Sequence, residues 1–182
     1  MPLASVSAFL GGIAENFNSN LVLHGNEYTV AEADEFDRSF LRLSPNIACI
    51  TSMDADHLDI YGDEEHLIEG FHQFAGKIKE GGSLIVRNGL AIAGETFGLE
   101  DDSDYSFQHI RIVDGVYHFD FKYKGGIYKD YTFLKPGRHN LLNALAAVSM
   151  AVKAGFAPEA LLPHLATFKG VKRRFSYIIK QK

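Results

Sequence analysis

A single cysteine, Cys49, is the only thiol in the 182 residues of this chain. A disulfide framework is therefore excluded, and the composition is typical of a protein from a reducing compartment. No apolar run approaches the length of a transmembrane span, and the amino end lacks the charged and apolar regions of a signal peptide. We therefore expect a cytoplasmic protein. The formal net charge of -5 gives no general reason to expect a nucleic acid or a membrane surface as a partner.

Two common catalytic signatures are missing as well. Nothing matches the phosphate-binding pattern G-x-x-x-x-G-K-[ST], and the pair Gly11 and Gly12 does not replace it. No serine stands in the context of a nucleophile elbow, so a Ser-His-Asp triad cannot be argued. The sequence also has no internal repeats. Its hydrophobic fraction of 46% is nevertheless ample for the core of one domain of this length.

The stretch of residues 47–61 carries the strongest signal. Residues 47–50 are apolar at every position, which is typical of a strand covered on both faces in a parallel sheet. Ligands in open α/β sheets bind at the carboxyl ends of the strands. The residues that follow this strand include four chemically active side chains, namely Asp54, Asp56, His57 and Asp59. Cys49, inside the strand, is expected to be a core residue rather than a catalytic thiol.

A second strand of the same design spans residues 28–31 and runs into the acidic segment Glu-Ala-Asp-Glu-Phe-Asp at residues 32–37. If the two strands are parallel neighbours, their acidic ends share one crevice. Carboxylates with one imidazole suit a hard divalent cation such as Mg²⁺, held by one or two protein ligands and by substrate phosphates. Alternatively, acidic residues at strand ends cap helices, and Asp37 and Asp63 could do so.

The remainder of the first half predicts a parallel βαβ unit. Residues 1–26 have a weak pattern, with an Asn-rich segment at residues 16–20 that is interpreted as loop. The first strand is therefore expected near Tyr28, and the amino end is expected to be truncated. A helix is predicted from Asp63 to the pair Gly81 and Gly82, because apolar residues recur at helical spacing. Residues 83–87 then form another strand.

The second half has a different texture. Residues 105–133 alternate between apolar and polar side chains, with hairpin signals at Asp114-Gly115 and Gly125-Gly126, and predict an antiparallel meander with aromatic core residues. Residues 141–153 and 158–166 predict helices. The basic cluster at residues 172–174 is either a solvated end or a phosphate clamp.

We therefore predict an α/β fold, with a mainly parallel sheet flanked by helices and an antiparallel β-meander extension. One truncated domain covers residues 1–182. It consists of a parallel α/β part (1–104), the meander (105–134), and a helical part with a terminal strand (135–182).

Four local patterns, in this order, resemble motifs of the Mur ligases. Residues 31–41 resemble the acidic motif of that family, and residues 51–59, Thr-Ser-Met-Asp-Ala-Asp-His-Leu-Asp, resemble its second motif. Residues 137–144, Gly-Arg-His-Asn-Leu-Leu-Asn-Ala, resemble the adenine-side motif, and residues 170–175, Gly-Val-Lys-Arg-Arg-Phe, resemble the arginine motif. Each pattern is weak alone, but their order and spacing are specific. The resemblance covers nearly the whole chain and is to the central ATPase domain after its P-loop helix.

The resemblance implies an ATP-dependent carboxylate-amine ligase of peptidoglycan synthesis that works through an acyl phosphate. Within the family, the motifs resemble most the branch that joins L-alanine to UDP-N-acetylmuramate, and the sites for these two substrates would lie largely outside this chain. Glu32 would ligate the Mg²⁺ that bridges the ATP phosphates, and His57 would ligate a second Mg²⁺. Asn140 and Asn143 would contact adenine, with His139 alongside. Arg174 would reach the phosphates.

The chemistry of phosphoryl transfer is consistent with these roles. Transfer to a carboxylate brings anions together, so the protein must neutralise and align them rather than supply a nucleophile. Asn140 and Asn143 are three positions apart at a helix start and would face the same side, although Asn140 could also cap that helix. Because residues 1–182 contain no P-loop, we expect no ligase turnover from this chain alone.

Three other functions stay open at this point. The first is another amide ligase of the same superfamily, with a different amino acid or acceptor. The second is a metal-dependent phosphohydrolase, which would release phosphate without an amine. The third is a non-catalytic module that binds a partner through the meander. The order and spacing of all four motifs favour the alanine-adding ligase.

Overall fold

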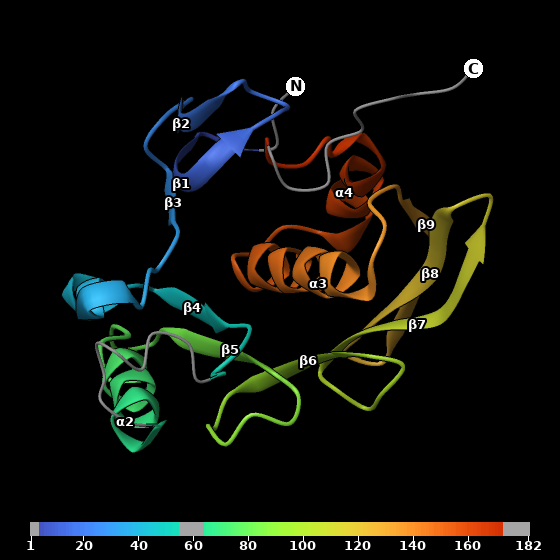
Figure 1. Ribbon diagram of the computed structural model, residues 1–182. Helices are drawn as coiled ribbons and strands as arrows, with labels where there is room; N and C mark the ends of the chain where they lie inside the picture. Colours follow the sequence, from blue (N-terminus) through green and yellow to red (C-terminus); the bar gives the residue numbers. More distant parts are fainter. Residues whose placement is uncertain (1–3, 55–63, 173–182) are drawn as a thin grey trace.

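The computed structural model describes residues 4–54 and 64–172 (Figure 1). Its elements, in chain order, are β1 (Val6–Ala14), β2 (Ser19–Leu23), β3 (Tyr28–Ala31), the 3₁₀ helix η1 (Phe36–Arg42), β4 (Ile47–Ile50), α2 (Glu64–Ala75), β5 (Ser83–Arg87), β6 (Glu95–Leu99), β7 (Tyr105–Val113), β8 (Val116–Tyr123), β9 (Gly126–Phe133), α3 (Arg138–Lys153), α4 (Pro158–Leu161) and the 3₁₀ helix η2 (Leu162–Thr167).

The larger of two sheets has the strand order β4-β5-β6-β7-β8-β9. The pairs β4–β5, β5–β6 and β6–β7 are parallel. The pairs β7–β8 and β8–β9 are antiparallel. The predicted mainly parallel sheet with an antiparallel meander is therefore confirmed. Strand β6 was not predicted from the sequence, because it is short, contains Gly98 and runs directly into an acidic loop.

Two helices cover opposite faces of the parallel part of this sheet, with α3 above it and α2 below it in Figure 1. Alternate residues of the strands belong to two separate cores. Those facing α3 include Ile47, Cys49 and Ile85, which pack in the cluster that contains Leu141 and Leu145. Those facing α2 include Ala48, Ile50 and Val86, which pack with Leu67, Phe71 and Phe74. This two-sided burial confirms the interpretation of residues 47–50.

The smaller sheet corrects the prediction that the first strand begins near Tyr28, because two strands precede it. Strand β1 lies between β2, which is antiparallel to it, and β3, which is parallel to it. Most side chains of β1 are only half-buried, and Gly11 and Gly12 interrupt its apolar pattern, so the sequence signal is weak. The strand is instead held by its two partners, with Ser7 opposite Leu23 of β2 and Val6 opposite Tyr28 of β3. The Tyr28 hydroxyl donates to the Ala154 carbonyl at 3.4 Å, which ties this sheet to the end of α3.

The structure differs from the sequence analysis at three further points. Strands β3 and β4 are not neighbours, because β3 pairs with β1 in the small sheet while β4 forms the edge of the large one. Helix α2 ends at Ala75, well before Gly81, and turns continue the chain to β5. Asp37 does not stand at the N-cap position of η1, which is Glu35, but inside the helix. Asp63, the other expected cap, lies outside the described residues.

The meander has the predicted aromatic core, in which Phe107, Phe119, Phe121 and Phe133 are buried. Its central strand also carries Asp120, which accepts a hydrogen bond from the Asp130 N–H at 2.9 Å and pairs with the His109 ring at the same distance. His109 and Asp130 have positive φ angles of 52° and 62° and lie where the register of β7 and β9 shifts. The Asp120 side chain therefore holds two irregular neighbouring strands together.

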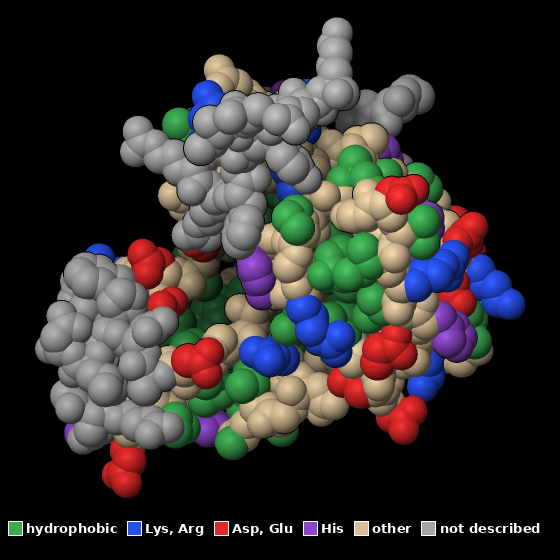
Figure 2. All heavy atoms as spheres, turned by 45° about the vertical axis from the view of Figure 1, so that its right-hand side comes forward, with side chains coloured by type: hydrophobic (Ala, Val, Ile, Leu, Met, Phe, Trp, Pro, Cys, Tyr) green, Lys and Arg blue, Asp and Glu red, His purple; other side chains and the backbone are tan. Residues whose placement is uncertain are grey.

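The surface is of mixed character. On the face shown in Figure 2, hydrophobic side chains form the floor of a hollow with acidic side chains at its rim, and acidic and basic side chains lie next to one another toward the right-hand side. Within the described part of the chain, no helix is long and apolar enough to cross a membrane. The predicted terminal strand falls on residues outside the described part.

Candidate functional site

The first part of the site is a carboxylate seated against a glycine. Glu32 follows the last residue of β3, and its backbone N–H donates to the Phe9 carbonyl at 3.1 Å, which continues the pairing with β1. The Gly11 N–H donates to Glu32 Oε2 at 2.7 Å. A Cβ atom on Gly11 would lie 2.5 Å from that oxygen, closer than real atoms approach. The Glu32 carboxylate therefore occupies a place that exists because residue 11 has no side chain.

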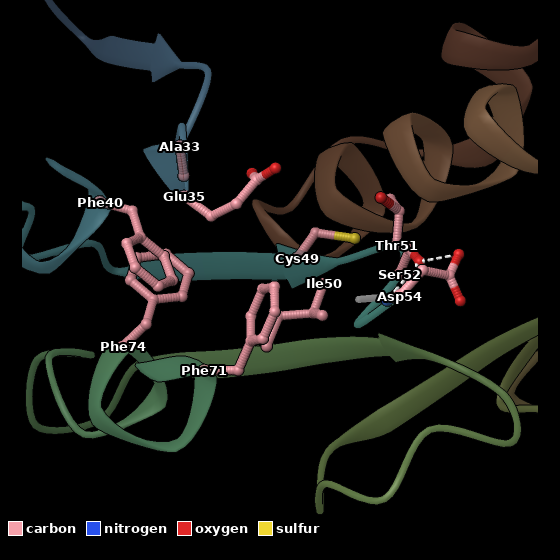
Figure 3. A pocket seen from close by; sticks show the side chains of 10 residues that line it. All are labelled: Ala33, Glu35, Phe40, Cys49, Ile50, Thr51, Ser52, Asp54, Phe71 and Phe74. Atoms are coloured by element: carbon pink, nitrogen blue, oxygen red, sulfur yellow. Dashed lines mark hydrogen bonds between the residues drawn. The ribbon is translucent and has the colours of Figure 1, made fainter. Parts of the chain in front are cut away.

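A small hollow of about 180 Å³ lies beside the end of β4. Glu35 reaches it from the segment after β3, and Thr51, Ser52 and Asp54 reach it from the end of β4 (Figure 3). The rings of Phe40, Phe71 and Phe74 line its other side. Although β3 and β4 belong to different sheets, the polar segments that follow them do converge.

Two residues of this hollow have defined local chemistry. The Ser52 hydroxyl donates to Asp54 Oδ2 at 2.5 Å, and the Asp54 N–H donates back to Ser52 Oγ at 3.1 Å, so this turn is held by its own side chains. Burial raises the pKa of the Cys49 thiol to about 12. Cys49, which packs against the core, is thus expected to stay protonated at neutral pH.

A larger hollow of about 340 Å³ opens at the beginning of α3. Asn140 and Asn143 both line it, which confirms that they face the same side of the helix. Asn140 is not the N-cap, because α3 begins at Arg138, and its Nδ2 donates to the Pro136 carbonyl at 2.6 Å. Two further polar side chains, Lys135 and His164, reach this hollow. The other residues that line it are Phe133, Ala144, Ala147, Leu165, Phe168, Gly170 and Val171.

The end of β1 is joined to residues 170–172, of which Gly170 and Val171 line the larger hollow. The Glu15 N–H donates to the Gly170 carbonyl and the Lys172 N–H donates to the Ile13 carbonyl, both at 2.9 Å. A Cβ atom on Gly12 would lie 2.5 Å from Cγ1 of Val171, which lines the larger hollow. Gly11 therefore meets the Glu32 carboxylate, and its neighbour Gly12 meets the wall of the larger hollow.

A family model described as the Mur ligase middle domain matches residues 14–151 of the chain. The chain belongs to the Mur ligase middle-domain family. It is 55% identical over 178 residues to the UDP-N-acetylmuramate--L-alanine ligase of Christiangramia forsetii and 54% identical over 178 residues to that of Flavobacterium psychrophilum. These alignments cover 98% of this chain but only 39% and 40% of the relatives, so the chain spans about two fifths of their length.

Solved structures agree with this assignment. The UDP-N-acetylmuramate-alanine ligase of Thermotoga maritima superposes with a TM-score of 0.83 at 26% identity, over 97% of this chain and 41% of that one. MurF from Acinetobacter baumannii superposes with a TM-score of 0.76 at 20% identity, over 98% of this chain and 43% of that one, and shares the fold.

Some of the site residues that the resemblance to the Mur ligases implies lie in the described part of the chain, and others lie outside it. Glu32, Asn140 and Asn143 lie in the described structure at the positions given above, and the His139 ring lies close to Gly137. His57 and Arg174, with Asp56 and Asp59, lie outside the described residues. Among the residues that are described, no three histidine, cysteine, aspartate or glutamate side chains gather as a metal cluster.

Sequence reasoning missed the role of Gly11 and Gly12 in this Mur ligase domain. The pair was noted only as part of a stretch with a weak pattern and as no replacement for a P-loop. Glycine inside a strand can also mark a bulge or a close approach of another group, and β1 has a register shift between Phe9 and Ala14. The adjacent glycines could therefore have indicated a strand that another group approaches closely.

Proposed function

We propose that this chain is the nucleotide-handling part of an ATP-dependent ligase that joins L-alanine to UDP-N-acetylmuramate in cytoplasmic peptidoglycan synthesis. Relatives named UDP-N-acetylmuramate--L-alanine ligase, more than half identical over nearly the whole chain, support this assignment. The observation that carries it is geometric: an exposed carboxylate and a hollow lined by two amides lie on either side of one Gly-Gly pair.

The Glu32 carboxylate fits a Mg²⁺ that is bound mainly by other groups. Its Oε2 atom is engaged by the Gly11 N–H, and within the described residues no other hydrogen bond involves the side chain. Mg²⁺ commonly keeps several waters and takes one or two protein carboxylates together with substrate phosphates, so a single carboxylate at this edge is sufficient. Such a cation would neutralise the phosphate charge during transfer. His57 is proposed as the ligand of a second Mg²⁺.

The larger hollow fits the adenine end of ATP. Its volume of about 340 Å³ is within the usual range for a small-molecule site, and apolar walls with a few polar groups are the usual lining. The amide of Asn143 offers one donor and one acceptor, which matches the edge of adenine. Residues 170–172 pass from this hollow to β1, and Arg174, two positions further, is proposed to contact the phosphates.

In this proposal the domain contributes alignment rather than a nucleophile. The substrate carboxylate attacks the γ-phosphorus of ATP, ADP leaves, and the amine of L-alanine then displaces phosphate from the acyl phosphate. Asn140 and Asn143 would fix the base, and Glu32 would hold the cation at the phosphate end. Fixing the base would lower the entropic cost of aligning the reactants, and holding the cation would lower the electrostatic cost of bringing anions together.

Calorimetric titration of the 182-residue chain with Mg-ATP tests this proposal. We expect saturable binding that is weakened by Glu32→Ala and by His57→Ala. Glu27→Ala is the matched control, because Glu27 is also an exposed carboxylate but lies in the turn before β3. Phosphate release without an amine would instead favour a phosphohydrolase, and binding unaffected by either site substitution would contradict the assignment.

A further inference from the structure

Gly11 has two properties that act on the same carboxylate. Its N–H donates to Glu32 Oε2 at 2.7 Å, and both Glu32 oxygens lie within 2.8 Å of where its Cβ would be. The sequence separates the two residues by 21 positions, and the pairing of β1 with β3 brings them together. The contact is therefore a product of the small sheet.

We propose that Gly11 is a positioning residue, which sets the orientation of the Glu32 carboxylate before a divalent cation and ATP bind. This inference rests on the proposed function, since it assumes that Glu32 is a metal ligand. With Oε2 held by the backbone, the carboxylate does not have to lose rotamer freedom when the cation arrives. Groups that hold a metal ligand in place commonly contribute a factor of about 10 to 100 to metal affinity.

The neighbouring Gly12 provides a matched contrast. Residues 11 and 12 do not have positive φ angles, so alanine is compatible with the backbone at both positions. An added methyl group therefore tests only the close approach. At residue 11 it meets the Glu32 carboxylate, whereas at residue 12 it meets Val171 in the wall of the larger hollow. The two substitutions should have different effects on nucleotide binding.

The experiment is a calorimetric measurement of two affinities for the 182-residue chain, one for Mn-ATP and one for ATP in the presence of EDTA. Their ratio isolates the contribution of the cation. Gly11→Ala is expected to lower this ratio by about 10- to 100-fold and to leave the metal-free affinity unchanged. Gly12→Ala is expected to weaken both affinities together and to leave the ratio unchanged.

A double-mutant cycle with Glu32→Ala tests whether Gly11 acts through Glu32. If it does, Gly11→Ala has no further effect on the ratio once Glu32 is alanine. The thermal midpoint supplies a second readout, because removing the Glu32 carboxylate also removes the clash. The double variant should therefore unfold at a higher temperature than Gly11→Ala. If Glu32→Ala lowers the ratio of the two affinities but Gly11→Ala leaves it unchanged, the positioning role of Gly11 is refuted. The assignment of Glu32 as a metal ligand would then still stand.

Failure of the proposed function has a different signature. If Glu32→Ala itself leaves the ratio unchanged, Glu32 is not a metal ligand, and both the metal assignment and this inference fall. If Gly11→Ala does not fold, amide hydrogen exchange on the unsubstituted chain decides. The Gly11 N–H should be protected there and lose its protection in Glu32→Ala, and equal exchange in both chains would refute the contact.

Discussion

The replacement of Asn143 by alanine is the sharpest test of where the base of ATP binds. Asn143 is exposed on the first turns of α3 and lines the larger hollow, and its amide has no hydrogen-bond partner within the described residues. Its side chain is therefore available to a ligand at no cost to the fold. Alanine at this position also has the higher helix propensity, so the free energy of unfolding should not fall.

The expected loss of affinity follows from the hydrogen bonds that the amide can make. One donor and one acceptor to adenine contribute about 1 kcal/mol each, or about 2 kcal/mol together. This corresponds to an increase of about 30-fold in the Kd for Mg-ATP. The weak affinity expected for Mg-GTP should not change, because guanine presents a different edge. Calorimetry with both nucleotides measures the two effects.

Two other asparagines serve as controls. Asn140→Ala should weaken ATP binding and also lower the free energy of unfolding by about 1 kcal/mol, because Asn140 additionally bonds the Pro136 carbonyl. Asn26→Ala, at an exposed residue before β3, should change neither quantity. A Kd for ATP that stays within about twofold of the original in Asn143→Ala would refute the placement of adenine in this hollow, since twofold is only about 0.4 kcal/mol.

Three further predictions concern the structure around the site. Leu145→Ala, at a fully buried position of α3, should lower the free energy of unfolding by about 2–5 kcal/mol in urea titrations, whereas Leu134→Ala, at an exposed position, should change it by less than about 0.5 kcal/mol. Because burial raises the pKa of Cys49 to about 12, the native chain should react slowly with a thiol reagent at pH 8 and the urea-unfolded chain rapidly; equal rates would contradict the burial of this thiol. Burial alone would raise the pKa of Asp120, but its hydrogen bonds outweigh this and hold the pKa below the ordinary value. The resulting stability is present above the unfolded-state pKa of about 3.9 and is lost as pH falls through the lower folded-state pKa. Asp120→Asn should therefore flatten the acid limb of stability against pH, and an unchanged acid limb would show that Asp120 contributes nothing to it.

The strands and helices with a clear local pattern could be predicted from the sequence. The apolar run of β4, the alternation of the meander and the Ala- and Leu-rich α3 each bury their side chains where their own periodicity places them. Strand β1 could not be predicted in this way. Its half-buried side chains and its two glycines carry little local signal, and its partners β2 and β3 both lie later in the chain.

The candidate site shows the same division. The motifs alone placed Asn140 and Asn143 on one side of a helix, because three positions on a helix return to the same face. They also singled out Glu32 as an acidic residue at the end of a strand. They did not indicate what holds Glu32, since its partner is a backbone N–H in a strand that the sequence did not reveal.

The sequence by itself therefore determined the family, the order of the motifs and the elements whose hydrophobic period is strong, because these depend on residues close together in the chain. Only the tertiary structure decided that β3 and β4 lie in different sheets and that residues 170–172 join the end of β1. It also decided that Gly11 and Gly12 meet a carboxylate and the wall of a hollow. Strand pairing is a choice among distant partners, and that choice is made by packing of the whole domain rather than by any local stretch.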